Sequence, residues 1–291
     1  MTSYDKPHLT YTEQSALLKN RGLIVNDAEF AVSKLKHISY YRLSAYFMPF
    51  QSSKDTFNGK ATFEQIIDLY HFDKELRILT FNAIEKIEIF LRTSIAYNFS
   101  REHGAFGYAD EANFCPQKED DFAWLQDDIA KETGRSKEAF IKHFRDNYSN
   151  EHLPIWMTVE IISFGTLSKL YTMLCPQTEK EILNGIGLPS FVFKNWLHVF
   201  SYVRNICAHH SRLWNRRFVI KAKIPNKIKE FDGIPNDLYY TFATMTHFVL
   251  RSINDTFDFK GELTALLSKY PAVNTKAMGF QDGWAESAVW Q

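Results

Sequence analysis

The longest regular stretch of this sequence spans residues 62–104 and reads TFEQIIDLYHFDKELRILTFNAIEKIEIFLRTSIAYNFSREHG. Its apolar side chains recur every three or four positions, which is the spacing that lines one face of an α-helix. Thr62 and Gln65 form a capping-box pattern at its start, and Gly104 follows its last periodic residues. The stretch therefore predicts one long helix, or two nearly collinear helices. The positions that set the period are Leu69, Phe72, Leu76, Leu79, Ala83, Ile87 and Leu91.

Helical patterns continue on both sides of this stretch. Upstream, Thr10 with Glu13 and Asn26 with Glu29 resemble capping boxes that begin runs reaching about residues 22 and 37. Strand patterns are weak, and only residues 218–220 and their neighbours could form one short extended piece. The sequence therefore predicts an all-α protein. Its further helices are expected over residues 120–131, 136–145, 155–163, 166–174, 178–184, 191–213, 237–253 and 261–270.

No internal repeat, low-complexity tract or Gly/Ser linker divides the chain into independent domains. We expect an N-terminal helical region at residues 1–61, packed on a helical core at residues 62–255. A C-terminal helix and tail follow at residues 256–291. The tail after Pro271 is rich in small residues, Gly and Trp, which leaves open whether it packs on the core.

The charges of this chain balance. Its 291 residues carry 34 Lys and Arg against 34 Asp and Glu, with a pI near 7.2. Binding of a nucleic acid through overall positive charge is therefore disfavoured, and any basic site must be local. No stretch reaches the roughly 18 consecutive apolar residues of a membrane helix, and the first residues lack the apolar core of a signal peptide. We expect a cytoplasmic protein with no membrane partner.

The three cysteines are odd in number and far apart, at Cys115, Cys175 and Cys207. This usage favours reduced thiols in a reducing compartment and supports neither a disulfide framework nor a zinc site. No phosphate loop, dinucleotide-binding glycine pattern or metalloprotease motif is present. His209 and His210 are adjacent, which is the wrong spacing for two ligands on one helix face. We therefore expect no metal and no cofactor.

One segment is strongly acidic. Residues 102–132 contain nine Asp and Glu against two Lys, which excludes this segment as an RNA-binding surface. A solvated acidic surface around the helix at residues 120–131 is the favoured interpretation. An autoinhibitory or partner-binding patch is the alternative.

A second segment is strongly basic. Between residues 204 and 229 there are eight Lys and Arg and no acid. On a helix continuing to residue 213, one stripe is apolar and the other is polar and cationic. The apolar stripe holds Val199, Val203, Ile206, His210 and Leu213, and the polar stripe holds Asn205, His209, Arg212 and Arg216.

His209 and His210 are therefore expected to differ in environment and in role. His210 on the apolar stripe is predicted to be a hydrogen-bonded core residue. His209 on the polar stripe could transfer a proton while a guanidinium neutralises charge on a phosphate oxygen, as cleavage of RNA by its own 2′-OH requires. A solvated or interface-facing surface is the alternative. Arg204 and His209 are about 140° apart on a helix, so they meet only through the length of Arg204, a helix distortion or a second copy.

The stretch from Arg204 to His209 resembles the Arg, polar residue, three residues, His motif of HEPN-domain ribonucleases. Its extension to Arg216 resembles the Abi-like (abortive infection, AbiD/AbiF-type) family of bacteria, as do residues 38–46, 73–77, 153–157 and 163–168. The resemblance implies a HEPN-like helical bundle with an N-terminal helical extension, and a role in anti-phage defence or as a toxin. It also implies a metal-independent endoribonuclease whose single motif is completed in a homodimer.

The resemblance also implies roles for particular residues. Arg204 and His209 would be the catalytic pair, and Asn205 would orient them. A small structured RNA is expected as a regulatory partner, besides the RNA substrate. The alternative is a non-catalytic module that holds such an RNA or senses a phage partner. The residues expected to position the RNA backbone are Arg212, Arg216, Arg217, Lys221 and Lys223.

Related proteins place an acidic residue on a preceding helix near the Arg/His pair. The candidates here are Glu85 and Glu88, one of which could hold the rotamer of Arg204. A local pair with Lys86 or Arg92, or exposure to solvent, is equally open. Residues 92–98 offer no histidine at the matching distance, so a second motif within this chain is in doubt.

Overall fold

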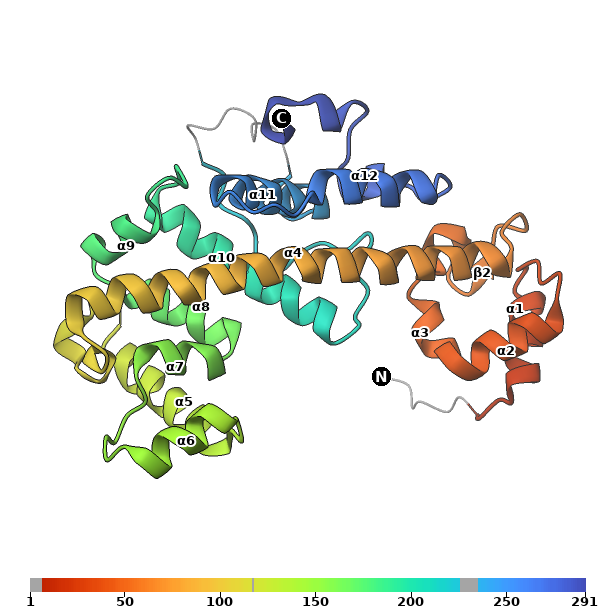
Figure 1. Ribbon diagram of the computed structural model, residues 1–291. Helices are drawn as coiled ribbons and strands as arrows, with labels where there is room; N and C mark the ends of the chain where they lie inside the picture. Colours follow the sequence, from red (N-terminus) through yellow and green to blue (C-terminus); the bar gives the residue numbers. More distant parts are fainter. Residues whose placement is uncertain (1–6, 117, 226–234) are drawn as a thin grey trace. The chain divides into compact units, whose positions relative to one another are not determined.

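The computed structural model describes residues 7–116, 118–225 and 235–291 (Figure 1). The chain forms two compact units. The first is drawn from Met1–Arg77 and Ala265–Val273, and the second from Ile78–Thr264 and Asn274–Gln291. Two helices contribute to both units: α4 (Phe63–His103) and α12 (Phe259–Lys269).

The prediction of an all-α protein is confirmed. In the described part of the chain, the only strands are β1 (Gln51–Ser53) and β2 (Thr56–Phe57), which pair antiparallel. This hairpin was missed because it is very short, and its turn places Asp55 at φ 62°. Residues 218–220, where a strand was considered, are irregular.

The helix starts of the first unit follow from side-chain caps. Thr10 and Glu13 form the predicted capping box at α1 (Tyr11–Asn20). The cap of α2 (Ala28–Ile38) is Asp27, one residue after the predicted Asn26, and its side chain accepts a hydrogen bond from Phe30 N. Ser39 then ends α2 and caps α3 (Tyr40–Ser44), and η1 (Met48–Phe50) leads into the hairpin. Helices α1 and α2 pack against each other.

A buried polar network lies inside the first unit. Tyr46 donates a hydrogen bond to Asp73 Oδ2 at 2.5 Å, and Arg77 forms an ion pair with the same oxygen. Asp73 and Arg77 are both buried and lie one turn apart on α4. The network therefore fixes α3 and its following loop onto the first part of α4.

The second unit is a helical bundle in which α8 packs against α5 and α10 (Figure 1). Its core contains large aromatic side chains, among them Phe164, Phe193 and Trp196. The 3-10 turns of its described residues include η2 (Gly107–Ala109), η3 (Glu111–Asn113) and η5 (Lys276–Met278). Besides α4 and α12, its helices are α5 (Asp121–Arg135), α6 (Ala139–Asn147), α7 (Ile155–Ile161), α8 (Phe164–Met173), α9 (Pro176–Ile182), α10 (Ser190–Ala208) and α11 (Tyr239–Ser252).

The tail after residue 273 packs on α11. Its last turns are η6 (Trp284–Glu286) and η7 (Ala288–Trp290), and Trp290 is buried. The ring of Trp290 stacks on His247 with centroids 4.7 Å apart, and Trp284 meets it edge to face. The tail therefore belongs to the core of the second unit.

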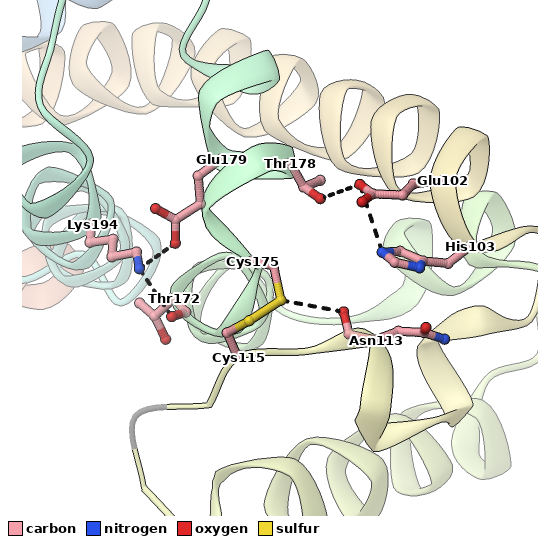
Figure 2. Close-up of a disulfide and its surroundings, with 9 residues drawn as sticks. All are labelled: Glu102, His103, Asn113, Cys115, Thr172, Cys175, Thr178, Glu179 and Lys194. Atoms are coloured by element: carbon pink, nitrogen blue, oxygen red, sulfur yellow. Dashed lines mark hydrogen bonds and ion pairs between the residues drawn. A yellow bond between two sulfur atoms is a disulfide. The ribbon is translucent and has the colours of Figure 1, made fainter.

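The expectation of three reduced thiols is wrong. Cys115 and Cys175 form a disulfide, 60 residues apart in sequence (Figure 2). Cys207 is buried and is not part of a disulfide. The sequence concealed this pair because the fold brings the segment after η3 against the residue that precedes α9. Cysteine usage therefore no longer supports the inference of a reducing compartment.

The expectation of a solvated acidic surface at residues 102–132 is only partly right. Asp121 is buried and accepts a hydrogen bond from Lys169 at 2.6 Å, and Glu132 is buried beside Arg135. Asp128 accepts from Thr166 at 2.6 Å. The acids that remain exposed are Glu102, Asp110, Glu111, Glu119, Asp120 and Asp127.

Throughout the described residues, every helix is too short or too polar to pass through a lipid bilayer.

Candidate functional site

Helix α10 ends at Ala208, five residues before the predicted end. His210 N donates to Cys207 O and Ser211 N donates to Ile206 O, both at 3.0 Å. These two bonds form a Schellman motif, in which the residue after the C-cap adopts a left-handed backbone conformation. His210 supplies it at φ 54°, a conformation that His tolerates better than most side chains.

This early end corrects the prediction for His210. Its side chain is exposed and does not join the apolar stripe of a continuing helix. Val199, Val203 and Ile206 on that stripe are buried as predicted, and Leu213 is buried from an irregular segment beyond the helix. His209 is the C-cap of α10, and its side chain is exposed.

Arg204 lies on the last turns of α10 and contacts α4. Its guanidinium carbon is 5.7 Å from the ring centroid of Phe81, and its Nε is 3.9 Å from Glu88 Oε2. The Nε atom is inaccessible to solvent, yet 35% of the side chain is exposed. Nη1 is 3.5 Å from Asn205 Oδ1. One edge of the guanidinium therefore faces protein while other parts of the side chain meet solvent.

Glu88 and Glu85 have different environments. The side chain of Glu88 is 14% exposed and pairs with Arg92 as well as with Arg204. The side chain of Glu85 is 54% exposed and lies 3.9 Å from Lys86. Only Glu88 lies at the site. It meets both interpretations left open by the sequence, because it pairs locally with Arg92 and also contacts Arg204, whereas Glu85 is exposed beside Lys86.

The predicted catalytic residues are brought together in part. Arg204, Asn205 and Glu88 form one cluster, and His209 follows one turn later at the helix end. Within the described ranges, the side chain of His209 makes no hydrogen bond or ion pair to Arg204. A single copy of the chain thus presents the arginine and the histidine as separate groups.

The basic segment after His210 runs back along α10. Trp196 Nε1 donates to Lys223 O at 2.8 Å, and Asn195 Nδ2 donates to Lys221 O at 3.2 Å. The rings of Tyr202 and Phe218 meet edge to face. This return places the backbone of Lys221 and Lys223 beside the first half of α10, about two turns before Arg204 along the helix.

The predicted RNA-binding side chains differ in availability. Arg217 is exposed but pairs with Asp237 at 2.7 Å, and Arg216 donates to Arg212 O at 3.1 Å. Lys221 and Lys223 are exposed, with Lys223 Nζ lying 5.5 Å from the Phe191 ring centroid. Two further lysines of this segment, Lys227 and Lys229, lie outside the described residues.

Sequence reasoning missed Phe81 and gave Arg92 no functional role. Phe81 lies seven residues before Glu88, two turns away on the same face of α4, and Arg92 lies one turn after it. This spacing was visible in the sequence. Only the fold shows that α10 reaches this face.

The fold defines an all-helical protein. Its candidate site is polar and cationic, with an exposed histidine at a helix end and an arginine that contacts a shielded carboxylate. The chain belongs to the Abi-like protein family, which it matches over residues 33–215. The matched region includes the Arg204–His209 motif and ends at Asn215, within the basic segment. Neither a curated protein nor a solved structure matches the chain.

Proposed function

We propose that this chain is a metal-independent endoribonuclease of an abortive-infection or toxin-like defence system. The observation that carries the proposal is that Arg204 and His209 lie within about one turn of each other at the end of α10, each with part of its side chain exposed. The arginine is anchored on Glu88 with part of its side chain exposed, and the histidine is exposed at the same helix end. Arginine suits a phosphate oxygen, and histidine suits a proton transferred near neutral pH.

In the proposed reaction, the ribose 2′-oxygen attacks the adjacent phosphorus and the bond from phosphorus to the 5′-oxygen breaks. One proton leaves the 2′-OH and one must reach the 5′-oxygen. His209 transfers one of these protons, Arg204 stabilises charge on the phosphoryl oxygens, and Asn205 orients Arg204. The products carry a 2′,3′-cyclic phosphate and a 5′-hydroxyl.

The proposal includes a homodimer, because two proton transfers are needed and each chain supplies one motif. Exposed apolar residues on α4 support this assembly. Ile78 and Ile89 are both exposed and lie within about 20° of each other around the helix. They border the face that carries Phe81 and Glu88. A second copy on this surface would bring two sites together.

The biological setting follows from the family. Membership in the Abi-like family supports a role in abortive infection. The proposed RNA substrate would belong to the cell or the phage. We place this activity in the cytoplasm, and we propose a small structured RNA as a regulatory partner held by the basic segment. Plating efficiency of phage on cells expressing wild type or His209→Ala tests the defence role.

The nuclease proposal is tested by incubating structured and single-stranded RNAs with the purified protein in EDTA. Wild type is expected to cut, and Arg204→Ala and His209→Ala are expected to lose at least 100-fold in rate while remaining folded. His143→Ala is the matched control, because His143 is an exposed histidine on α6. Full cleavage by the folded Arg204 and His209 variants would overturn the assignment. Tight binding with no cleavage by wild type would favour the non-catalytic RNA-holding module.

A further inference from the structure

We propose that Arg92 is a positioning residue, which holds Glu88 so that Glu88 can orient Arg204. This inference rests on the proposed nuclease function and extends it to a residue outside the Arg/His motif. Arg92 lies one turn after Glu88 on α4, and its Nη2 pairs with Glu88 Oε1. The same Nη2 donates to Ile162 O at 3.0 Å, at the C-cap of α7.

The two oxygens of Glu88 are divided between two guanidinium groups. Oε1 binds Arg92, whereas Oε2 lies 3.9 Å from Arg204 Nε. A carboxylate with both oxygens free would accept a bidentate pair from Arg204 and occupy the edge that a phosphate needs. By engaging Oε1, Arg92 limits the contact between Glu88 and Arg204 to the Nε atom of Arg204. Glu88 therefore leaves the Nη edge of Arg204 to an RNA phosphate, with Asn205 Oδ1 lying 3.5 Å from Nη1.

Arg92 itself is poorly placed to touch RNA. Its side chain is 12% exposed, and its Nη1 is inaccessible to solvent and without a hydrogen-bond partner in the described residues. Its action therefore passes through Glu88. An arginine fork can bind a carboxylate and a carbonyl from a fixed plane, whereas lysine offers only a point charge.

The contact with Ile162 also joins the site to α8. Ile162 precedes Ser163, whose side chain accepts a hydrogen bond from Thr166 N at the start of α8. Arg92 thus ties the turn between α7 and α8 to the carboxylate at the site.

The kinetic test compares Arg92→Ala, Arg92→Lys and Glu88→Gln with wild type on one RNA substrate. We expect kcat to fall 10- to 100-fold in Arg92→Ala with KM changed less than threefold, and partial recovery in Arg92→Lys. The double variant Arg92→Ala/Glu88→Gln should be no slower than the slower single variant, because both act through one carboxylate. Arg101→Ala is the control, because Arg101 is an exposed arginine on the same helix that pairs with Glu181.

A second readout separates this inference from the nuclease proposal and from a purely structural role. The Nε–H group of Arg204 is shielded from solvent, so its ¹H–¹⁵N signal can be assigned by its loss in Arg204→Lys. Arg92→Lys and Glu88→Gln should shift this signal in folded protein, and Arg101→Ala should not. Shifts without RNA cleavage would uphold the positioning role and sink the nuclease proposal. An unmoved signal, or a folded Arg92→Ala variant that keeps full kcat, would overturn the positioning role.

Discussion

Two acid–arginine pairs with the same spacing lie on α4 and differ in what surrounds them. Asp73 and Arg77 are both buried, and Tyr46 completes their network. Glu88 and Arg92 also lie one turn apart, but Glu88 meets a further arginine that is partly exposed. The first pair is closed and structural. The second pair reaches solvent through Arg204, whose side chain is 35% exposed, and this is where we propose that a ligand binds.

The closed pair gives a stability prediction. Asp73→Ala should lower the free energy of unfolding by about 3–5 kcal/mol, because buried Arg77 loses its carboxylate. Tyr46→Phe should cost about 1 kcal/mol, because one hydrogen bond to that carboxylate is lost. Urea denaturation of the purified variants measures both. A loss below 1 kcal/mol for Asp73→Ala would contradict the structural role of the pair.

His247 gives a pH prediction. Burial, together with the nearby cations Arg251 and Lys260, lowers its pKa to about 4. The unfolded chain binds this proton near pH 6.5, whereas the folded chain resists it until about pH 4. The contribution of neutral His247 to the free energy of unfolding is therefore fully present above pH 6.5 and is lost as the pH falls from 6.5 to 4. Because the imidazole is only half-buried, the expected loss is about 2 kcal/mol.

The matched variant for this effect is His247→Phe, which keeps a ring against Trp290 and removes the titrating group. The unfolding free energies of wild type and His247→Phe are compared from pH 7.5 to pH 4. The comparison cancels the titration of carboxylates that both proteins share. A difference that stays constant over this range would show that His247 does not couple folding to pH.

At the scale of elements, hydrogen bonds at a helix terminus decide where the helix ends and which side chains it exposes. The sequence predicted a helix at residues 191–213 from its period, but the Schellman motif at His210 stops α10 at Ala208. No glycine marks this end, so the usual stop signal was absent. The early end exposes both histidines and lets the basic segment return along α10.

The disulfide ties another pair of elements together. Cys175 is the N-cap of α9, which also binds α4 through Thr178 and Glu102 at 2.7 Å and α10 through Glu179 and Lys194 (Figure 2). These polar contacts do not depend on the disulfide. Reduction is therefore expected to leave the protein folded but less stable.

The closed loop of 60 residues sets the size of this effect. Reduction should lower the free energy of unfolding by up to about 4 kcal/mol, because the unfolded chain regains the freedom that the loop removes. Urea denaturation with and without dithiothreitol measures it. Cys115→Ser/Cys175→Ser is the control and should not respond to reductant. Equal midpoints for oxidised and reduced wild type would contradict a stabilising disulfide.

At the scale of the whole molecule, features that depend on local periodicity could be predicted, whereas contacts between residues far apart in the sequence could not. The helix at residues 62–104 and the all-α class followed from apolar spacing and capping residues, because both act within a few turns. The disulfide, the packing of Trp290 on His247 and the burial of Asp121 could not be predicted. Each joins residues that only the folded chain brings together.

The candidate site shows the same division. The motif marked Arg204 and His209, and their helix was correctly predicted up to its last turn. The sequence could not choose between Glu85 and Glu88, because the choice depends on which face of α4 meets α10. Phe81 and Arg92 were found only through that contact.

The balanced total charge of the chain bears on where RNA would bind. The chain carries equal numbers of acidic and basic residues, so the proposed RNA partner is expected to bind the acid-free segment that follows Arg204 rather than the surface as a whole. Arg217 is partly neutralised by Asp237, whereas Lys221 and Lys223 remain exposed. RNA should therefore approach along α10 toward the helix end that carries His209.

The most direct test of the central claim is cleavage of one RNA in EDTA at a mapped site. The same oligonucleotide is then made with a single 2′-deoxy nucleotide at the scissile position. Wild type should cut the all-RNA strand, leave a 2′,3′-cyclic or 3′-phosphate, and leave the 2′-deoxy strand intact, because the attacking oxygen is missing. Equal cleavage of both strands, or cleavage abolished by EDTA, would contradict 2′-OH attack by an Arg204 and His209 site.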